Sequence, residues 1–160
     1  MVGETIRIEE LRIKKIEEGT VIDHIPAGYA LSVLKILNIS GKEGFTVSIA
    51  MNVPSRKLKK KDIVKIEKRE LKEEEVNKIA LIAPTATINI IKDYKVIKKR
   101  RITLPSVIEN ILKCINPRCI TNSPREKVTT KFLVINKKPV KLKCKYCGTI
   151  LELEDIISQF

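Results

Sequence analysis

Apolar residues recur with two different spacings along the first hundred residues of this chain. Alternation of apolar and polar side chains predicts strands, whereas recurrence every three to four residues predicts helices. The predicted strands are 11–16, 21–26, 45–53, 62–70, 85–92 and 94–101, the predicted helices are 27–37 and 71–83, and a turn is expected at 18–20. From residue 21 onward, the order is β-α-β-β-α-β-β. We therefore expect an α+β fold, a ferredoxin-like antiparallel sheet with two helices and an added edge strand.

The segment 102–107 contains Pro105 and few periodic cues, so it is the expected hinge between two domains, 1–104 and 105–160. The second domain shows almost no helical pattern and is predicted to be a small all-β unit. Its expected strands are 108–113, 131–136, 140–143 and 149–153. A core built from so few residues rarely suffices alone, so a metal ion is expected to stabilise it.

All four cysteines of the chain lie in this second part, as two close pairs. Cys114 and Cys119 have the spacing C-x₄-C, and Cys144 and Cys147 have the spacing C-x₂-C. Two such pairs can bring four thiolates to one structural Zn²⁺ ion, which leaves no open coordination position for catalysis. Two disulfides are the alternative. A cytoplasmic location, expected because neither a signal peptide nor a bilayer-spanning apolar segment is recognisable, favours the metal.

The formal net charge of +13 favours anionic partners, namely nucleic acid, nucleotides or an acidic protein surface. The chain contains neither a G-x₄-G-K-[S/T] loop nor a G-x-G-x-x-G loop, which argues against an NTPase or a dinucleotide-dependent enzyme. No Ser-His-Asp, Cys-His or paired-carboxylate arrangement is evident, so we expect no catalytic activity.

Polar residues on the predicted strands indicate a candidate anion site. Lys61 and Lys65 share one face of their strand, because side chains alternate between faces. By the same rule the pairs that share a face are Asn89 with Ile91 and Tyr94 with Val96. A phosphate site on a sheet needs ammonium groups from neighbouring strands and an amide or carboxylate for the ribose and base. Taken singly, these lysines are more simply explained as a solvated strand face, and the only histidine, His24, as an ordinary paired histidine.

Four motifs in a fixed order carry a resemblance to a known family. They are G-T-V-I-D-H-I-P at 19–26, N-V-P-S at 52–55 followed by K-D-I-V-K-I-E at 61–67, A-P-T-A-T-I-N at 83–89, and the two cysteine pairs. Together they resemble the regulatory chain of aspartate carbamoyltransferase, over roughly residues 11–153. The co-occurrence of four motifs is far more specific than any one of them.

The resemblance implies an N-terminal allosteric domain that binds CTP, ATP or UTP and a C-terminal zinc domain that contacts the catalytic chain. It implies that Asp23 and His24 meet the ribose, phosphate and base, and that Lys61, Lys65 and Lys99 hold the ribose and triphosphate. The residues implied to line the base pocket are Ile16, Val21, Asn89, Ile91, Tyr94 and Val96. Regulatory dimers would bridge catalytic trimers, and the protein would be a non-catalytic subunit that controls pyrimidine biosynthesis.

Two features depart from the family pattern. Lys15 stands where a small residue would leave more room beside the base, and the tip at 56–60 is more basic than a nucleotide pocket requires. The additional residues before Leu11 would alter any second nucleotide site. These departures concern base preference rather than the general assignment.

A zinc ribbon that binds nucleic acid is the alternative reading. However, residues 1–104 carry 22 basic and 14 acidic side chains, and residues 105–160 only 10 and 5, so the zinc domain is not the main basic region. It also has few aromatic side chains on which bases could stack. A nucleotide sensor without an enzyme partner is a third possibility.

Overall fold

The computed structural model describes residues 13–160. Of the strand predicted at 11–16, residues 11 and 12 lie outside the described residues, and residues 13–16 are not in a strand. The remaining predicted elements of the first part are present, with ends shifted by a few residues.

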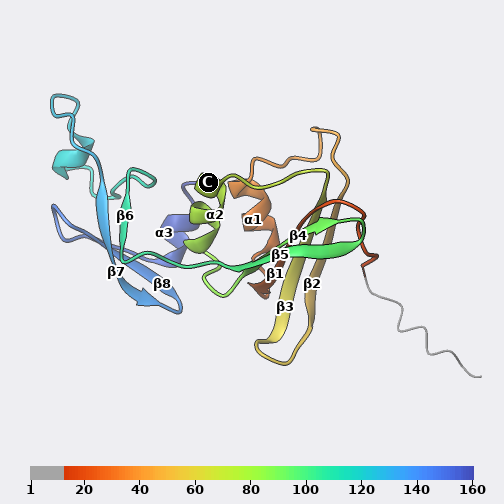
Figure 1. Cartoon of the computed structure of the whole chain (residues 1–160). Helices are drawn as coiled ribbons and strands as arrows, with labels where there is room; N and C mark the ends of the chain where they lie inside the picture. Colours follow the sequence, from red (N-terminus) through yellow and green to blue (C-terminus); the bar gives the residue numbers. More distant parts are fainter. Residues whose placement is uncertain (1–12) are drawn as a thin grey trace, which may run out of the picture.

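Five antiparallel strands form one sheet in the order β2-β3-β1-β4-β5, and two helices lie against it (Figure 1). The strands are β1 (Gly19–Pro26), β2 (Val47–Ser55), β3 (Lys59–Glu67), β4 (Thr87–Lys92) and β5 (Lys95–Arg101), and the helices are α1 (Ala30–Ile36) and α2 (Glu73–Ala80). The connection from β1 through α1 to β2 leaves β3 between the two strands, as in a split βαβ unit. The predicted ferredoxin-like sheet with an added edge strand is confirmed.

The turn predicted at 18–20 is wrong, because β1 already begins at Gly19. The φ angle of Gly19 is +140°, and a Cβ atom at this position would lie 2.1 Å from the carbonyl oxygen of Ile66 on β3. Only glycine tolerates both the backbone conformation and this close approach. The glycine therefore extends the strand instead of turning the chain.

The main core lies between the sheet and the two helices. Ile22 of β1 pairs in register with Val64 of β3 and with Ile88 of β4, so the three side chains share one face of the sheet. They are buried together with Val33 of α1 and Ile79 of α2. Burial of side chains of this size contributes about 1.5–3 kcal/mol each. The opposite face of the sheet carries both polar and apolar side chains, among them Lys65, Asn89 and Val21.

A buried aspartate, Asp62, joins α1 to two strands. Its Oδ2 accepts hydrogen bonds from the backbone N–H groups of Gly28 (2.8 Å) and Ala30 (2.9 Å), at the start of α1. Its Oδ1 accepts one from the N–H group of Asn52 on β2 (2.8 Å). The side chain is fully buried. A buried carboxylate is stable here because three backbone donors replace its water shell.

The second part of the chain forms a four-stranded antiparallel sheet in the order β6-β7-β8-β9. The strands are β6 (Val107–Glu109), β7 (Lys131–Lys137), β8 (Val140–Cys144) and β9 (Ile150–Leu151). The small β unit is confirmed, although its first strand is shorter than predicted. The 3₁₀ turn η1 (Ile120–Asn122) and the helix α3 (Leu153–Ile157) were not predicted, because elements this short carry no measurable periodicity.

The two sheets share one continuous cluster of buried apolar residues, which runs from Ile22 and Ile79 through Leu104 to Phe132 and Ile156. In Figure 1, α1 and α2 lie between the five-stranded sheet and α3. Packing of the second part against the first is therefore apolar. Among residues 13–160, no helix has the length and apolar character needed to cross a lipid bilayer.

Candidate functional site

One row of side chains crosses the open face of the five-stranded sheet. Val21 of β1 pairs with Lys65 of β3 and with Asn89 of β4, and Asn89 pairs with Lys99 of β5. Residues paired in antiparallel strands point to the same face. The face is the one opposite Ile22, because neighbouring residues of a strand alternate. Four residues that the resemblance implies for the nucleotide site thus lie side by side.

A β-bulge places two consecutive residues of β1 at the end of this face. The register of β1 against β3 shifts between Ile22 and Ile25, so that β1 contains one extra residue. His24, inside the bulge, has a φ angle of +56°. An extra residue in one strand breaks the alternation of faces. Asp23 and His24 can therefore both serve the same site, which a regular strand would not allow.

The contacts of these two residues confirm that they adjoin the row. Lys61 Nζ lies 2.9 Å from Asp23 Oδ1, and His24 Nδ1 lies 3.3 Å from Thr87 Oγ1 on β4. Burial lowers the pKa of His24, and the positive charges of Lys61, Lys57 and Lys99 lower it further, against the opposing effect of Asp23. The imidazole is therefore neutral near pH 7 in the absence of an anion.

Lys65 and Asn89 are the polar residues at the centre of the row. Lys65 Nζ donates to the carbonyl oxygen of Lys14 (3.0 Å), and burial lowers the pKa of this lysine. Asn89 Oδ1 is buried and accepts no hydrogen bond from any of residues 13–160. A buried carbonyl oxygen without a donor costs about 1–3 kcal/mol. The side-chain amide of Asn89 is therefore positioned to accept a hydrogen bond from a ligand.

The apolar residues predicted for the base pocket differ in their exposure. Ile16 and Ile91 are buried, and Val21 is half-buried. Tyr94 and Val96 remain more than half exposed, although Val96 pairs with Ile91 and so lies beside the row. The N–H group of Tyr94 donates to the carbonyl oxygen of Glu17 (3.0 Å), which fixes the β4–β5 turn against the segment before β1.

Arg101 was missed by the sequence reading, although a simple signal was present. It follows Lys99 by two residues on β5, so both side chains share a face. In the structure Arg101 pairs with Thr87, which pairs with Asp23. The arginine therefore lies next to the row, beside the bulge.

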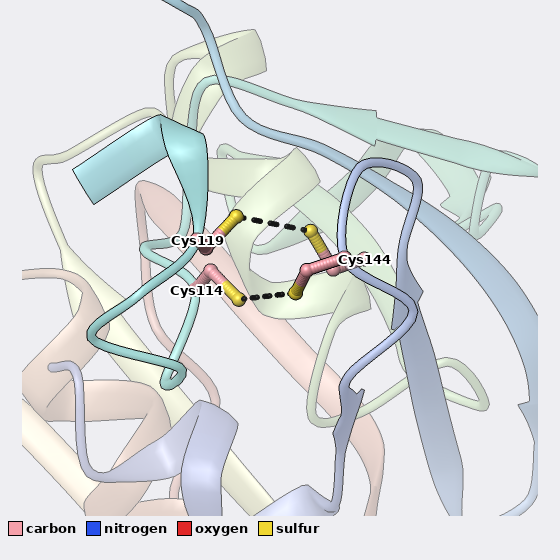
Figure 2. A group of neighbouring side chains, drawn as sticks. Cys114, Cys119 and Cys144 are labelled. Atoms are coloured by element: carbon pink, nitrogen blue, oxygen red, sulfur yellow. Dashed lines mark hydrogen bonds between the residues drawn. The ribbon is translucent and has the colours of Figure 1, made fainter. Parts of the chain in front are cut away.

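The four cysteines gather at one point in the second part of the chain. Cys114 and Cys119 lie in the loop after β6, and Cys144 ends β8 (Figure 2). Cys147 lies in the turn before β9. All four Sγ atoms lie within 4.8 Å of one another, and none of these cysteines forms a disulfide. The Sγ atoms of Cys114 and Cys147 are 3.5 Å apart, and those of Cys119 and Cys144 are 3.7 Å apart.

These separations fit one tetrahedral zinc ion. With Zn–S bonds of about 2.3 Å, the edge of the tetrahedron is about 3.8 Å. Burial raises the pKa of the Cys114 thiol to about 12, whereas the hydroxyl of Thr149, hydrogen-bonded to Cys147, lowers the pKa of Cys147 to about 6. The hydroxyl of Thr121 donates a hydrogen bond to Cys119 Sγ (3.1 Å). Hydrogen bonds of this kind orient and stabilise a thiolate that binds a metal ion. Zinc would be held structurally, with no position open to substrate.

Comparison with protein families matches both parts of the chain. The model described as the aspartate carbamoyltransferase regulatory chain, allosteric domain, matches residues 11–103. The model described as the metal binding domain of the same regulatory chain matches residues 106–157.

Curated proteins named "Aspartate carbamoyltransferase regulatory chain" are similar over nearly their whole lengths. The protein of Thermofilum pendens is 59% identical over 151 residues, which cover 94% of this chain and 95% of the relative. The protein of Hyperthermus butylicus is 58% identical, covering 93% of each. The protein of Pyrococcus horikoshii is 59% identical, covering 93% of this chain and 97% of the relative.

Proposed function

Since this chain belongs to the family of aspartate carbamoyltransferase regulatory chains, we propose that residues 1–104 bind a nucleotide effector and residues 105–160 pass its effect to the catalytic chain. The protein is a non-catalytic allosteric subunit, and its partner is the catalytic chain. Its metal-binding part holds a structural metal ion. Sites made of four cysteines usually bind zinc. The proposed effectors are CTP, ATP and UTP.

The observation that carries the nucleotide site is the row of Lys65, Val21, Asn89 and Lys99 across four strands, with Asn89 Oδ1 buried and without a donor. The exocyclic amino group of cytosine or adenine, or the ring N3–H of uracil, would supply that donor. Lys61, Lys65 and Lys99 supply cations for the triphosphate through charge-assisted hydrogen bonds. Ile16, Val21, Ile91, Tyr94 and Val96 provide the apolar surroundings of the base, with Asp23 and His24 at the ribose and phosphate.

Allosteric control in this arrangement is a coupling free energy between the nucleotide and the quaternary state of the partner. Such coupling is typically about 1–3 kcal/mol, and it is reciprocal. A nucleotide that binds both states equally would shift nothing. Regulatory dimers that bridge two catalytic trimers would let one bound effector act on both trimers.

We expect the chain to co-purify with catalytic trimers, and CTP, ATP and UTP to change the aspartate dependence of the complex. Lys65→Gln removes a central cation and should weaken nucleotide binding by roughly tenfold to a hundredfold, as for the loss of a hydrogen bond to a charged group. Lys42→Gln, in the exposed loop between α1 and β2, removes the same charge and should leave affinity unchanged. Calorimetric titration of each complex measures the difference.

Absence of both a complex and a nucleotide response would overturn this proposal. Equal weakening by Lys65→Gln and Lys42→Gln would instead show that the overall positive charge, rather than the row, attracts the nucleotide. Tight binding to DNA or RNA with a steep salt dependence, and no binding of free nucleotides, would favour the nucleic-acid alternative.

The pH dependence of nucleotide binding should report His24. Its pKa is lowered in the free protein, and a bound triphosphate raises it, so binding takes up a proton. Affinity should therefore rise as pH falls from 8 to 6, by at most roughly tenfold per pH unit. The charged groups around the imidazole are Asp23, Lys57, Lys61 and Lys99. The triphosphate also titrates here, so the difference between wild type and His24→Gln isolates the histidine. Parallel pH profiles would contradict the prediction.

We also propose that the boundary between the two functional units lies at residues 104–105, and that the protein acts in the cytoplasm. The boundary is supported by the change of sheet after β5. The cytoplasm is supported by four cysteines that are free of disulfides, since a reducing compartment preserves thiolate ligands.

A further inference from the structure

The side chain of Gln159, which follows α3, pairs with a residue that lies 46 positions away in the sequence. Its Oε1 accepts a hydrogen bond from the N–H group of Lys113 (2.7 Å), and its Nε2 donates one to the carbonyl oxygen of the same residue (2.8 Å). A side-chain amide carries an acceptor and a donor next to each other, so it can pair with both backbone groups of one residue. A single side chain therefore holds both backbone groups of Lys113.

Lys113 directly precedes Cys114, the first of the four cysteines. Two further side chains hold the residues on either side of Lys113. Thr130 Oγ1 donates to the carbonyl oxygen of Leu112 (2.6 Å), and Asn122 Nδ2 donates to that of Cys114 (2.8 Å). Three consecutive residues that end at a metal ligand thus have their backbone fixed by side chains from outside the segment.

Cys114 is the one of the four cysteines that borders no strand or helix. Residues 110–119 form neither, whereas Cys119 immediately precedes η1, Cys144 ends β8 and Cys147 lies in the turn between β8 and β9. Ordering a loop when a metal binds costs conformational entropy, and contacts that order the loop beforehand reduce this cost. The pairing of Gln159 with Lys113 therefore supports the ligand that has the least support from regular structure.

We propose that Gln159 is a positioning residue of the metal site, and that it places Cys114 through the backbone of Lys113. The proposal rests on metal binding by the four cysteines. Gln159 contributes no bond to the metal. Its side chain acts on the residue before the ligand, in the way that groups behind a metal site orient the ligands themselves.

The same contact links the metal site to the junction between the two parts of the chain. Helix α3 begins at Leu153, which lines an apolar cavity of about 280 Å³ together with Pro26 and Ile82 of the first part. The helix thus faces the first part at its start, and Gln159 after its end holds the backbone next to Cys114. The placement of this ligand would therefore depend on how α3 packs at the junction, an effect beyond the proposed function.

Release of zinc from the full-length, zinc-loaded chain to an excess of a chromogenic chelator tests the proposal. Gln159→Leu keeps the approximate size of the side chain and removes both hydrogen bonds, and it should speed zinc release by roughly tenfold. Ser158→Ala is the matched control, because it removes a hydrogen bond that stays within α3, from Ser158 Oγ to the carbonyl oxygen of Asp155 (2.9 Å). It should change the rate by less than about twofold. Neither side chain is buried, so both variants should fold.

Replacement of zinc by Co²⁺ gives a second readout, which a general loss of stability would not change. The visible absorption of Co²⁺ bound to four thiolates depends on the geometry of the ligands around the ion. In solutions where each chain holds one ion, the spectrum of Gln159→Leu should differ from that of the wild type. The spectrum of Ser158→Ala should match that of the wild type.

The proposal is overturned if either the zinc release or the cobalt spectrum of Gln159→Leu equals that of the wild type, even where its melting temperature falls. Equal acceleration of zinc release by Ser158→Ala would also overturn it, because fraying of α3 would then explain the result. Failure of the metal site itself would appear as a wild-type chain without bound zinc. The two failures are therefore distinguishable.

Discussion

Replacing Cys119 with serine is expected to unfold the second part of the chain and to abolish its assembly with catalytic trimers. Cys119 is buried, and its Sγ lies 3.7 Å from that of Cys144 on the opposite loop. The metal joins the loop after β6 to the turn after β8, and no other covalent or metal link does so among the described residues. Zinc binding by four cysteines contributes about 10–16 kcal/mol, more than so small a core supplies alone.

Zinc content, hydrogen exchange and co-purification measure this effect. Amides of β7 and β8 should lose protection in Cys119→Ser or after chelation, whereas those of β1 and β4 should keep it. Nucleotide binding by the first part should survive, since the row on the five-stranded sheet contains no residue of the second part. Thr121→Val, which removes only the hydroxyl that donates to Cys119 Sγ, is the matched control and should weaken zinc binding by roughly tenfold to a hundredfold. Assembly of the metal-free chain with catalytic trimers would show that zinc has no such role.

Substitution of Asp62 by alanine is expected to cause the second large loss, this time in the first part of the chain. The change leaves the N–H groups of Gly28, Ala30 and Asn52 without their acceptor, in a site where Asp62 itself is fully buried. An unsatisfied buried group costs about 1–3 kcal/mol. The bond from Ala30 is buried and those from Gly28 and Asn52 are part-buried, so the free energy of unfolding should fall by about 3 kcal/mol. The melting temperature should fall by roughly 6–12 °C.

Thermal unfolding of the zinc-loaded chain checks this expectation. Asp62→Asn keeps one acceptor oxygen and should lose less stability than Asp62→Ala. Substitution of an exposed acid, Glu70→Ala, is the control for the change of charge and should lower the melting temperature by no more than about 2 °C. A melting temperature of Asp62→Ala equal to that of Glu70→Ala would show that the three N–H groups find other partners.

Local pattern predicted most of the fold but placed several boundaries wrongly. The alternation in β2 and the helical spacing of α1 and α2 depend on neighbours in sequence, and these elements were found. Gly19 was taken for a turn residue, because its close approach to Ile66 depends on a strand nearly fifty residues away. Asp62 was taken for an ordinary strand residue, because its three donors come from two other elements.

The sequence by itself predicted the fold class from the spacing of apolar residues, the regulatory family from four motifs in a fixed order, and one group of four cysteines able to hold a metal ion from the two close cysteine pairs. Only the tertiary structure decided how the site is assembled. Strand register brings Lys65, Asn89 and Lys99 into one row, and the bulge in β1 gives Asp23 and His24 a common face. Register and packing depend on contacts between residues far apart in sequence, which no local pattern specifies.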